Sequence, residues 1–162
     1  MNLEPLALIH VHPLLRQWDR PTRSDWANVL ATYPLFAGVS RRRLRKLANK
    51  ATFAEFAPGE TIIFAGDRDQ SLYIVLGGDV KAVSTLARRV LGSGDYFGEV
   101  AMIDGRPRSA TVVAISYAHV MKLPAPSVMK LARRHAGMTL NIVGDLTARL
   151  RHLETQAAAR AA

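Results

Sequence analysis

The pattern of hydrophobic and polar positions divides the chain into two helical parts with a strand-rich part between them. Three- to four-residue apolar spacing predicts a helix from Ser24 that Pro34 ends, and a basic helix with an N-cap at Ser40 that runs to about Lys50. After residue 51, alternating and β-branched positions predict strands at 52–56, 61–65, 71–76, 80–84, 89–91, 110–115 and 119–123. Short strands separated by Gly and Pro indicate a barrel or jelly roll.

The residues after Pro124 return to the helical pattern. Residues 126–134 predict one helix, Gly137 is expected to break it, and residues 139–160 predict a longer helix. The apolar positions of the longer helix form a stripe that is expected to pack mostly against the strands: Leu140, Val143, Leu146, Leu150 and Leu153. Because Gly and Pro are rare within it, this helix is expected to move as a rigid unit about the Gly137 region.

Composition narrows the class of protein. A chain of 162 residues with 49% hydrophobic residues suits one domain with a real core. The absence of cysteine excludes disulfides and thiolate metal sites, and it fits a reducing compartment. No apolar run approaches the roughly 20 residues of a membrane helix, and the N-terminus lacks the basic cluster of a signal peptide. We therefore expect a cytoplasmic protein without a membrane span.

The net charge of +9 comes from 22 Lys and Arg against 13 Asp and Glu. The densest cluster is residues 41–46, RRRLRK, on the predicted basic helix. The favoured interpretation is a solvated helix face with Leu44 and Leu47 buried, because no nucleic-acid-binding motif accompanies the charge. Contact with an acidic protein surface or an anionic membrane stays open. A positive field would also speed the association of an anionic ligand.

The segment 96–112, YFGEVAMIDGRPRSATV, carries the strongest chemical signal. It follows a turn-rich stretch and predicts a short helix that opens near Gly98, whose first N–H groups attract phosphate. Gly98 allows close approach to the backbone, Arg108 offers a planar cationic fork for phosphate oxygens, and Ser109 adds a hydroxyl. Glu99 cannot bind phosphate, but it can accept a hydrogen bond from a sugar hydroxyl. A cyclic nucleotide meets both demands, since it has one phosphate and one free ribose hydroxyl.

This segment resembles the phosphate-binding cassette of the cyclic nucleotide-binding domain family. The family pattern is Phe-Gly-Glu, apolar residues, a turn, then Arg, Ser/Thr/Ala, Ala, any residue and Val, and no position is missing here. The resemblance implies that Glu99 holds the ribose 2′-OH and that Arg108 and Ser109 hold the phosphate. It also implies that the amides of Gly98 and Ala101 face the ribose and phosphate, with Val100 and Ala110 beside them.

The resemblance extends over residues 24–155 and implies an α+β fold. This fold is an eight-stranded antiparallel β-roll (jelly roll) with N-terminal helices and a C-terminal hinge and lid helix pair. The expected organisation is an N-terminal extension, 1–23; helices, 24–50; the β-roll, 51–123, with its cassette, 97–110; the C-terminal helices, 124–155; and a tail, 156–162.

The same resemblance implies which residues surround the base. Ala82, Arg89 and Leu91 would border the purine, and Leu153 of the last helix, with Glu154 and Thr155, would act as its lid. Arg89 departs from the small or apolar residues common at its position, and it could stack on the base or donate to a guanine oxygen. Cyclic GMP therefore stays open, although family frequency favours cyclic AMP.

The leading hypothesis is a stand-alone, non-enzymatic cyclic nucleotide sensor that moves its C-terminal helices and acts on an unidentified protein partner. The alternatives are a cyclic GMP-binding module, an interaction module of the same fold that has lost its ligand, and a regulator that lacks its DNA-binding helix-turn-helix. Direct nucleic-acid contact and a cofactor other than the nucleotide ligand are not expected. No catalytic set of residues is apparent.

Two competing motifs are weak. Gly92, Gly94 and Gly98 lie one residue off the dinucleotide-binding fingerprint, and no long helix of a βαβ unit follows them. His10-Val11-His12 has metal-ligand spacing but lies in a proline-broken segment without a following Glu, so a pair of surface or docking histidines is the favoured interpretation. We expect no metal site.

Overall fold

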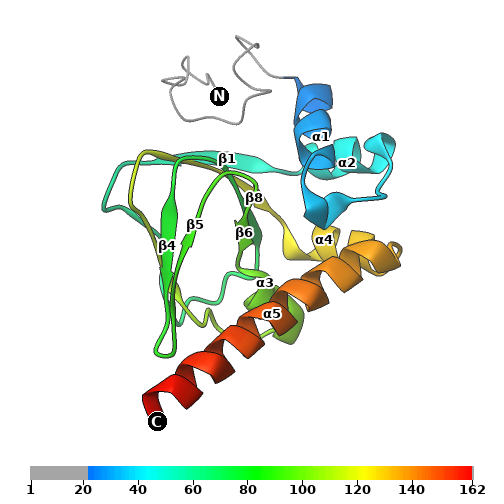
Figure 1. Ribbon diagram of the computed structural model, residues 1–162. Coiled ribbons are helices and arrows are strands. Elements are labelled where there is room, and N and C mark those ends of the chain that lie inside the picture. The colour runs from blue at the N-terminus through cyan, green and yellow to red at the C-terminus, as the bar shows by residue number, and fades with distance from the viewer. Residues whose placement is uncertain (1–21, 162) are drawn as a thin grey trace.

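The strands pair into two antiparallel sheets that face each other as a β-roll (Figure 1). The computed structural model describes residues 22–161. One sheet has the strand order β1-β8-β3-β6 and the other β2-β7-β4-β5. The strands are β1 Thr52–Phe56, β2 Thr61–Ile63, β3 Leu72–Gly77, β4 Val80–Val83, β5 Arg88–Leu91, β6 Tyr96–Phe97, β7 Thr111–Ala114 and β8 Ala118–Leu123. The expected eight-stranded antiparallel roll is confirmed.

The helices gather on one side of the roll, and the longest of them runs past α3 to the C-terminus (Figure 1). The helical elements are α1 Arg23–Ala31, η2 Pro34–Phe36, α2 Arg41–Ala48, α3 Glu99–Asp104, α4 Ala125–Ala132 and α5 Ala136–Ala161. Helix α4 packs against α2, α3 and α5, and α5 also packs against η2. Helix α4 therefore connects the N-terminal helices to both α3 and α5. No helix in the described residues is long and apolar enough to cross a membrane.

Strand β3 separates two hydrophobic cores. Because successive side chains on a strand point to opposite faces, Tyr73 and Val75 pack inside the roll, whereas Leu72, Ile74 and Leu76 pack beneath the helices. The whole strand is buried. The helices are therefore fixed to the outer face of the same strand whose inner face supports the interior of the roll.

Several predicted boundaries differ from the structure. Helix α1 begins at Arg23 because Thr22 and Asp25 form a capping box, in which the Asp25 carboxylate accepts from the Thr22 amide at 2.6 Å. Ser40 is the N-cap of α2, but its side chain makes no capping hydrogen bond. Strand β6 was not predicted as a strand, because two residues give no alternation to detect.

The expected break at Gly137 is wrong, because Gly137 lies in the first turn of α5. The chain turns instead between Ala132 and Ala136. There the amides of Arg134 and His135 bond to carbonyls three residues earlier, which tightens the end of α4 without a glycine.

Candidate functional site

The cassette forms a turn that joins strand β6 to helix α3. Gly98 is the N-cap of α3 and has a φ of +89°, a conformation that favours glycine. A Cβ on Gly98 would lie 2.5 Å from Arg108 Nη1 and 2.8 Å from the Ser71 carbonyl oxygen. Glycine is therefore required both by the turn and by the close approach of Arg108. As the sequence predicted, a short helix starts here, and the amides of its first turn have no intrahelical acceptor.

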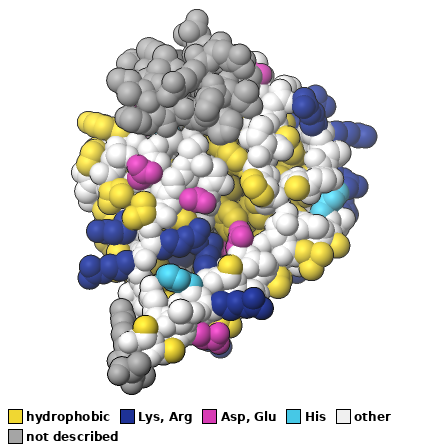
Figure 2. Space-filling view, viewed as in Figure 1, with side chains coloured by type: hydrophobic (Ala, Val, Ile, Leu, Met, Phe, Trp, Pro, Cys, Tyr) yellow, Lys and Arg dark blue, Asp and Glu magenta, His cyan; other side chains and the backbone are white. Residues whose placement is uncertain are grey.

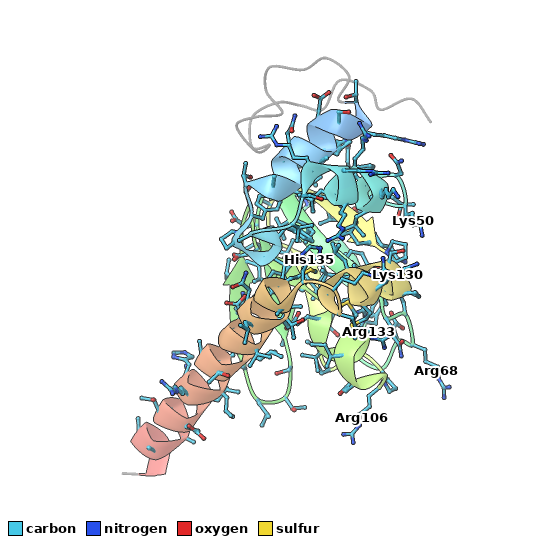
Figure 3. The ribbon with its side chains drawn as sticks, turned by 90° about the vertical axis from the view of Figure 1, so that its right-hand side faces the viewer. Lys50, Arg68, Arg106, Lys130, Arg133 and His135 are labelled. Carbon is cyan, nitrogen blue, oxygen red and sulfur yellow. The ribbon has the colours of Figure 1, made fainter. Side chains whose placement is uncertain are left out.

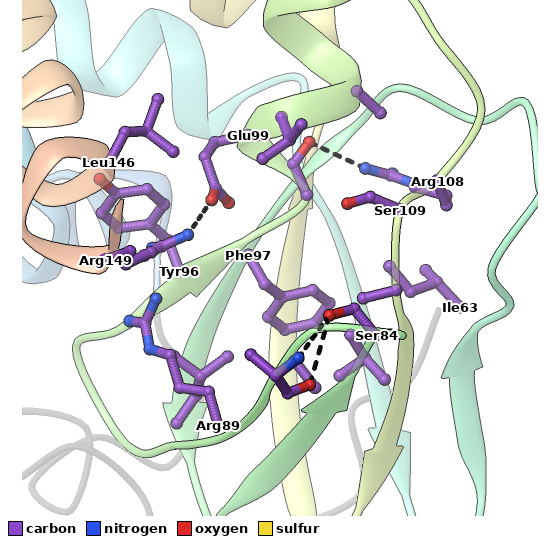
Figure 4. A pocket seen from close by; sticks show the side chains of 18 of the residues that line it. Ile63, Ser84, Arg89, Tyr96, Phe97, Glu99, Arg108, Ser109, Leu146 and Arg149 are labelled. Atoms are coloured by element: carbon purple, nitrogen blue, oxygen red, sulfur yellow. Dashed lines mark hydrogen bonds and ion pairs between the residues drawn. The ribbon is translucent and has the colours of Figure 1, made fainter. Parts of the chain in front are cut away.

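Arg108 is buried and its guanidinium is fixed by backbone carbonyls. Nη1 donates to the Gly98 carbonyl at 2.9 Å (Figure 4), and Nη2 donates to the Ser71 carbonyl at 2.7 Å. The Nε–H group is also buried but has no hydrogen-bond partner among residues 22–161. A buried cationic donor without a partner is costly, and an anion in the adjoining space would satisfy it.

Asp69 orients Arg108, and the sequence analysis did not identify it. Its carboxylate accepts from Arg108 Nη2 at 3.1 Å and lies 3.3 Å from Lys122 Nζ. Partial burial opposes ionisation, but hydrogen bonds from Ser71, Tyr73 and Lys122 outweigh it and hold the pKa of Asp69 well below its usual range. Asp69 therefore stays ionised and pairs with the fork of Arg108. It lies 39 residues before Arg108, so no local motif could have indicated the pair.

Glu99 pairs with an arginine of helix α5. The Glu99 side chain is only 3% exposed, and its carboxylate accepts from Arg149 Nη1 (Figure 4). One helical turn earlier, Asp145 accepts from the Tyr96 hydroxyl at 2.5 Å. Burial raises the pKa of Tyr96, and the bond to Asp145 raises it further, so the phenol remains a donor. Two polar contacts, one turn apart on α5, thus connect this helix to the cassette.

All eleven residues proposed from the sequence line one cavity of about 330 Å³. They come from β4, β5, the cassette and α5, although ligand binding by them stays a prediction: Ala82, Arg89, Leu91, Gly98, Glu99, Val100, Ala101, Arg108, Ser109, Ala110 and Leu153. Helix α5 also contributes Leu146, Arg149 and Leu150, which the sequence analysis did not assign to the site. These positions recur at three- to four-residue spacing with Leu153, so they share one helix face. Glu154 and Thr155 are exposed and do not line the cavity, because they lie off that face.

The cavity is electropositive. Burial lowers the pKa of Arg89, and the nearby charge of Arg149 lowers it further, although surrounding carboxylates partly oppose both effects. Arg149 Nη2 is buried and, like Arg108 Nε, has no hydrogen-bond partner in the described part of the chain. In Figure 2, Lys and Arg side chains gather beside α5 over the hairpin that carries Lys81, Arg88 and Arg89. The arrangement favours an anionic ligand.

No group of three or more metal-ligating side chains occurs in residues 22–161. The pair His10 and His12 lies outside the described residues.

Comparison with known proteins agrees with this geometry. A family model described as the cyclic nucleotide-binding domain matches residues 53–135, half of the chain. The chain is 31% identical over 118 residues to a cAMP-dependent protein kinase regulatory subunit of Mycosarcoma maydis, covering 70% of this chain and 22% of that protein. It is 35% identical over 101 residues to a cGMP-dependent protein kinase of Toxoplasma gondii, covering 62% of this chain and 10% of the kinase.

Among solved structures, the regulatory domain of Toxoplasma gondii PKA with cAMP superposes with a TM-score of 0.67 at 25% identity. The match covers 78% of this chain and 50% of that one. The chain thus spans less than a quarter of the two kinase relatives and half of the solved regulatory domain. With its β-roll and its cassette, the chain belongs to the cyclic nucleotide-binding domain family.

Proposed function

We propose that this domain is a cyclic AMP sensor in which nucleotide binding releases helix α5 from the cassette. One observation carries the proposal: the Arg149 guanidinium of α5 donates a hydrogen bond to the Glu99 carboxylate and forms an ion pair with it. Glu99 is the residue that, by the family pattern, accepts the ribose 2′-OH. A nucleotide whose ribose hydroxyl donates to Glu99 therefore competes with Arg149 of α5 for the same carboxylate oxygens.

The other groups of the cavity fit the remaining parts of the ligand. Arg108 Nε, the Ser109 hydroxyl and the first amides of α3 are the donors for the phosphate. Leu146, Leu150 and Leu153 of α5 line the same cavity, so a base that enters it displaces apolar contacts that α5 makes without nucleotide. Binding would shift the population of α5 positions by as much as the nucleotide prefers one position over another.

The choice of cyclic AMP rests on the relatives. A cAMP-dependent kinase subunit and a cAMP-bound regulatory domain are among the proteins that this chain resembles. Cyclic GMP is the second candidate, because Arg89 lines the cavity with donors that could meet a guanine oxygen, and a cGMP-dependent kinase is also similar. Parallel calorimetric titrations with the two nucleotides distinguish them.

The release of α5 can be tested directly, since the chain has no cysteine and two can be introduced cleanly. Spin labels at Thr85→Cys, in the β4–β5 loop, and Ala157→Cys, on α5, report the distance between these exposed positions. We expect the distance distribution to shift when cyclic AMP saturates the protein. Tight binding with an unchanged distribution would refute the coupling, and no binding of either nucleotide would refute the sensor itself.

A further inference from the structure

A second recess lies between helices α2 and α4 and is separate from the nucleotide cavity. Its volume is about 560 Å³, larger than the nucleotide cavity. Five cations surround it: Arg43, Lys46 and Lys50 from α2 and the residues after it, and Lys130 and Arg134 from α4 and its end. All five are exposed, and no acidic residue lines the recess. We call this recess, with its five cations, the basic groove.

The cations of the basic groove lack acidic partners. In residues 22–161 none of the five forms an ion pair with a carboxylate. Arg43 Nη1 donates to the ring Nε2 of His135, an acceptor without negative charge. In Figure 3, Lys50 and Lys130 extend into solvent from the same side of the molecule, with Arg133 below them. The charge of the groove is thus available to an external anion.

Helix stability explains only part of this charge, because Lys46 and Lys130 lie in the last turns of α2 and α4, where the helix dipole favours cations. Helix α2 has Arg41, Arg42 and Arg43 in its first turn and no acidic residue there, although the N-terminal end of a helix favours negative charge. Arg41–Arg45 and Arg42–Lys46 are like-charge pairs four residues apart, which destabilise a helix by about 0.2–0.5 kcal/mol each. Arg43 is therefore a cation of the groove that the dipole of its own helix does not favour.

The floor of the groove is apolar. Leu47 and Leu131 lie there at 4% and 8% exposure, and Pro126 lines it as well. A recessed apolar floor with a cationic rim accommodates an apolar side chain flanked by carboxylates. A nucleic-acid backbone has no apolar side chain to place there, and the groove offers no aromatic ring on which a base could stack. Insertion into a membrane would require protruding apolar side chains, whereas these two leucines are recessed, and electrostatic attraction to anionic lipid would leave the apolar floor uncovered.

We propose that the basic groove binds an acidic peptide segment of a partner protein, anchored by an apolar side chain over Leu47 and Leu131. The groove spans the contact between α2 and α4, and α4 also packs on α3 and α5. The partner would therefore dock on a helix that contacts both the cassette and the moving helix.

The proposal is tested with a short fluorescent peptide of Glu residues around a central Leu, at ionic strength of about 0.15 M. We expect saturable binding by fluorescence anisotropy. Replacement of the peptide's Glu residues by Gln should abolish binding, and replacement of its Leu by Ser should weaken it severalfold. If the Ser peptide binds as well as the parent, the apolar anchor is wrong and the attraction is only of charge.

The double variant Lys46→Glu, Lys130→Glu reverses one exposed cation on each side of the groove. It should weaken peptide binding roughly tenfold or more, equivalent to about 1.4 kcal/mol. The control, Arg23→Glu with Arg88→Glu, makes the same change of net charge at exposed positions outside the groove and should change the affinity less than about twofold. An equal loss of peptide affinity in both variants would show that the groove is not the binding site. Failure of the parent protein to bind the peptide would refute the proposal as well.

Duplex DNA and vesicles of phosphatidylcholine with phosphatidylserine serve as competitors. One result would refute the peptide proposal. It is that DNA or vesicles displace the peptide from the parent protein and bind the groove variant, but not the control variant, more weakly than the parent. Cyclic AMP titration of the Lys46→Glu, Lys130→Glu variant provides the remaining control, and thermal melting shows whether the Arg23→Glu, Arg88→Glu variant is folded. Unchanged nucleotide affinity shows that the fold is intact and separates a failure of this proposal from a failure of the nucleotide sensor.

Discussion

Removal of the Arg149 side chain tests whether helix α5 competes with the nucleotide for Glu99. The pair is a charge-assisted hydrogen bond whose acceptor side chain is 3% exposed and whose donor is 28% exposed. Such a bond contributes about 1.5–3 kcal/mol, and every 1.4 kcal/mol corresponds to about tenfold in affinity. If the ribose hydroxyl has to replace Arg149, Arg149→Ala should bind cyclic AMP roughly tenfold to a hundredfold more tightly than the parent protein.

Arg149 is also a cation beside an anion site, and its loss works in the opposite direction. Arg89→Ala measures this second effect, because Arg89 lines the same cavity but forms no ion pair with Glu99 in the described residues. Isothermal titration calorimetry of the two variants gives both dissociation constants. We expect Arg89→Ala to weaken binding of cyclic AMP and Arg149→Ala to tighten it.

A second readout separates affinity from stability. Without nucleotide, Arg149→Ala leaves the buried Glu99 carboxylate without its cation. The melting temperature of this variant should therefore fall below that of the parent protein. Saturating cyclic AMP should restore most of the loss, since the ligand then satisfies Glu99. The competition is refuted if Arg149→Ala binds cyclic AMP no more tightly than Arg89→Ala, because Arg149 would then act only as a cation of the site.

Three further predictions concern the cassette and the roll. Gly98→Ala should weaken cyclic AMP binding more than tenfold in calorimetry, because its Cβ would displace Arg108 and Ser71. Gly94→Ala is the control: its φ is similarly positive, but its Cβ would meet only a tyrosine ring at 3.5 Å, so it measures the backbone strain of roughly 1–2 kcal/mol without the clash. Asp69→Asn should weaken binding roughly tenfold, since Arg108 loses a charged partner, with little effect on the distance reported by the spin labels on α5. Burial lowers the pKa of His119 below its usual 6.5, although the nearby Glu55 partly opposes this, so the unfolded chain binds more protons as the pH falls below about 6.5. The free energy of unfolding in urea should therefore fall from pH 7.5 to 5.5, and His119→Gln should reduce that fall; an equal fall in both proteins would contradict it.

The parts of the site that are contiguous in the chain could be predicted from the sequence. Gly98, Glu99 and Arg108 lie within one cassette, and the turn that presents them follows from a glycine and a short helix. The strands were also predictable, because each has alternating or β-branched residues between turn signals. Strand β6 was the exception, since it is recognised only by its pairing with β3.

The parts that depend on tertiary packing could not be predicted. Arg149 lies 50 residues after Glu99, and the apolar stripe of its helix indicated packing but not which polar side chain meets the carboxylate. The helix break predicted at Gly137 was wrong because tertiary packing, and not the glycine, places the turn. A glycine is tolerated in the first turn of a helix, whereas the actual turn before α5 is made at Arg134 and His135, whose amides donate to carbonyls three residues earlier.

The burial of Glu99 bears on the proposed coupling between the nucleotide and helix α5. A carboxylate placed where it can meet a sugar hydroxyl inside a cavity loses most of its hydration, and an unpaired buried charge costs several kcal/mol. Glu99 therefore requires a strong donor whenever the ribose hydroxyl is absent, and the Arg149 guanidinium of α5 provides one. Because that donor lies on a helix outside the roll, the requirement of Glu99 is one of the contacts that hold α5 against the cassette, beside the bond from Tyr96 to Asp145. In the proposed sensor, the coupling between ligand and helix thus follows from the need of one buried carboxylate for a hydrogen-bond donor, which either Arg149 or the ribose hydroxyl supplies.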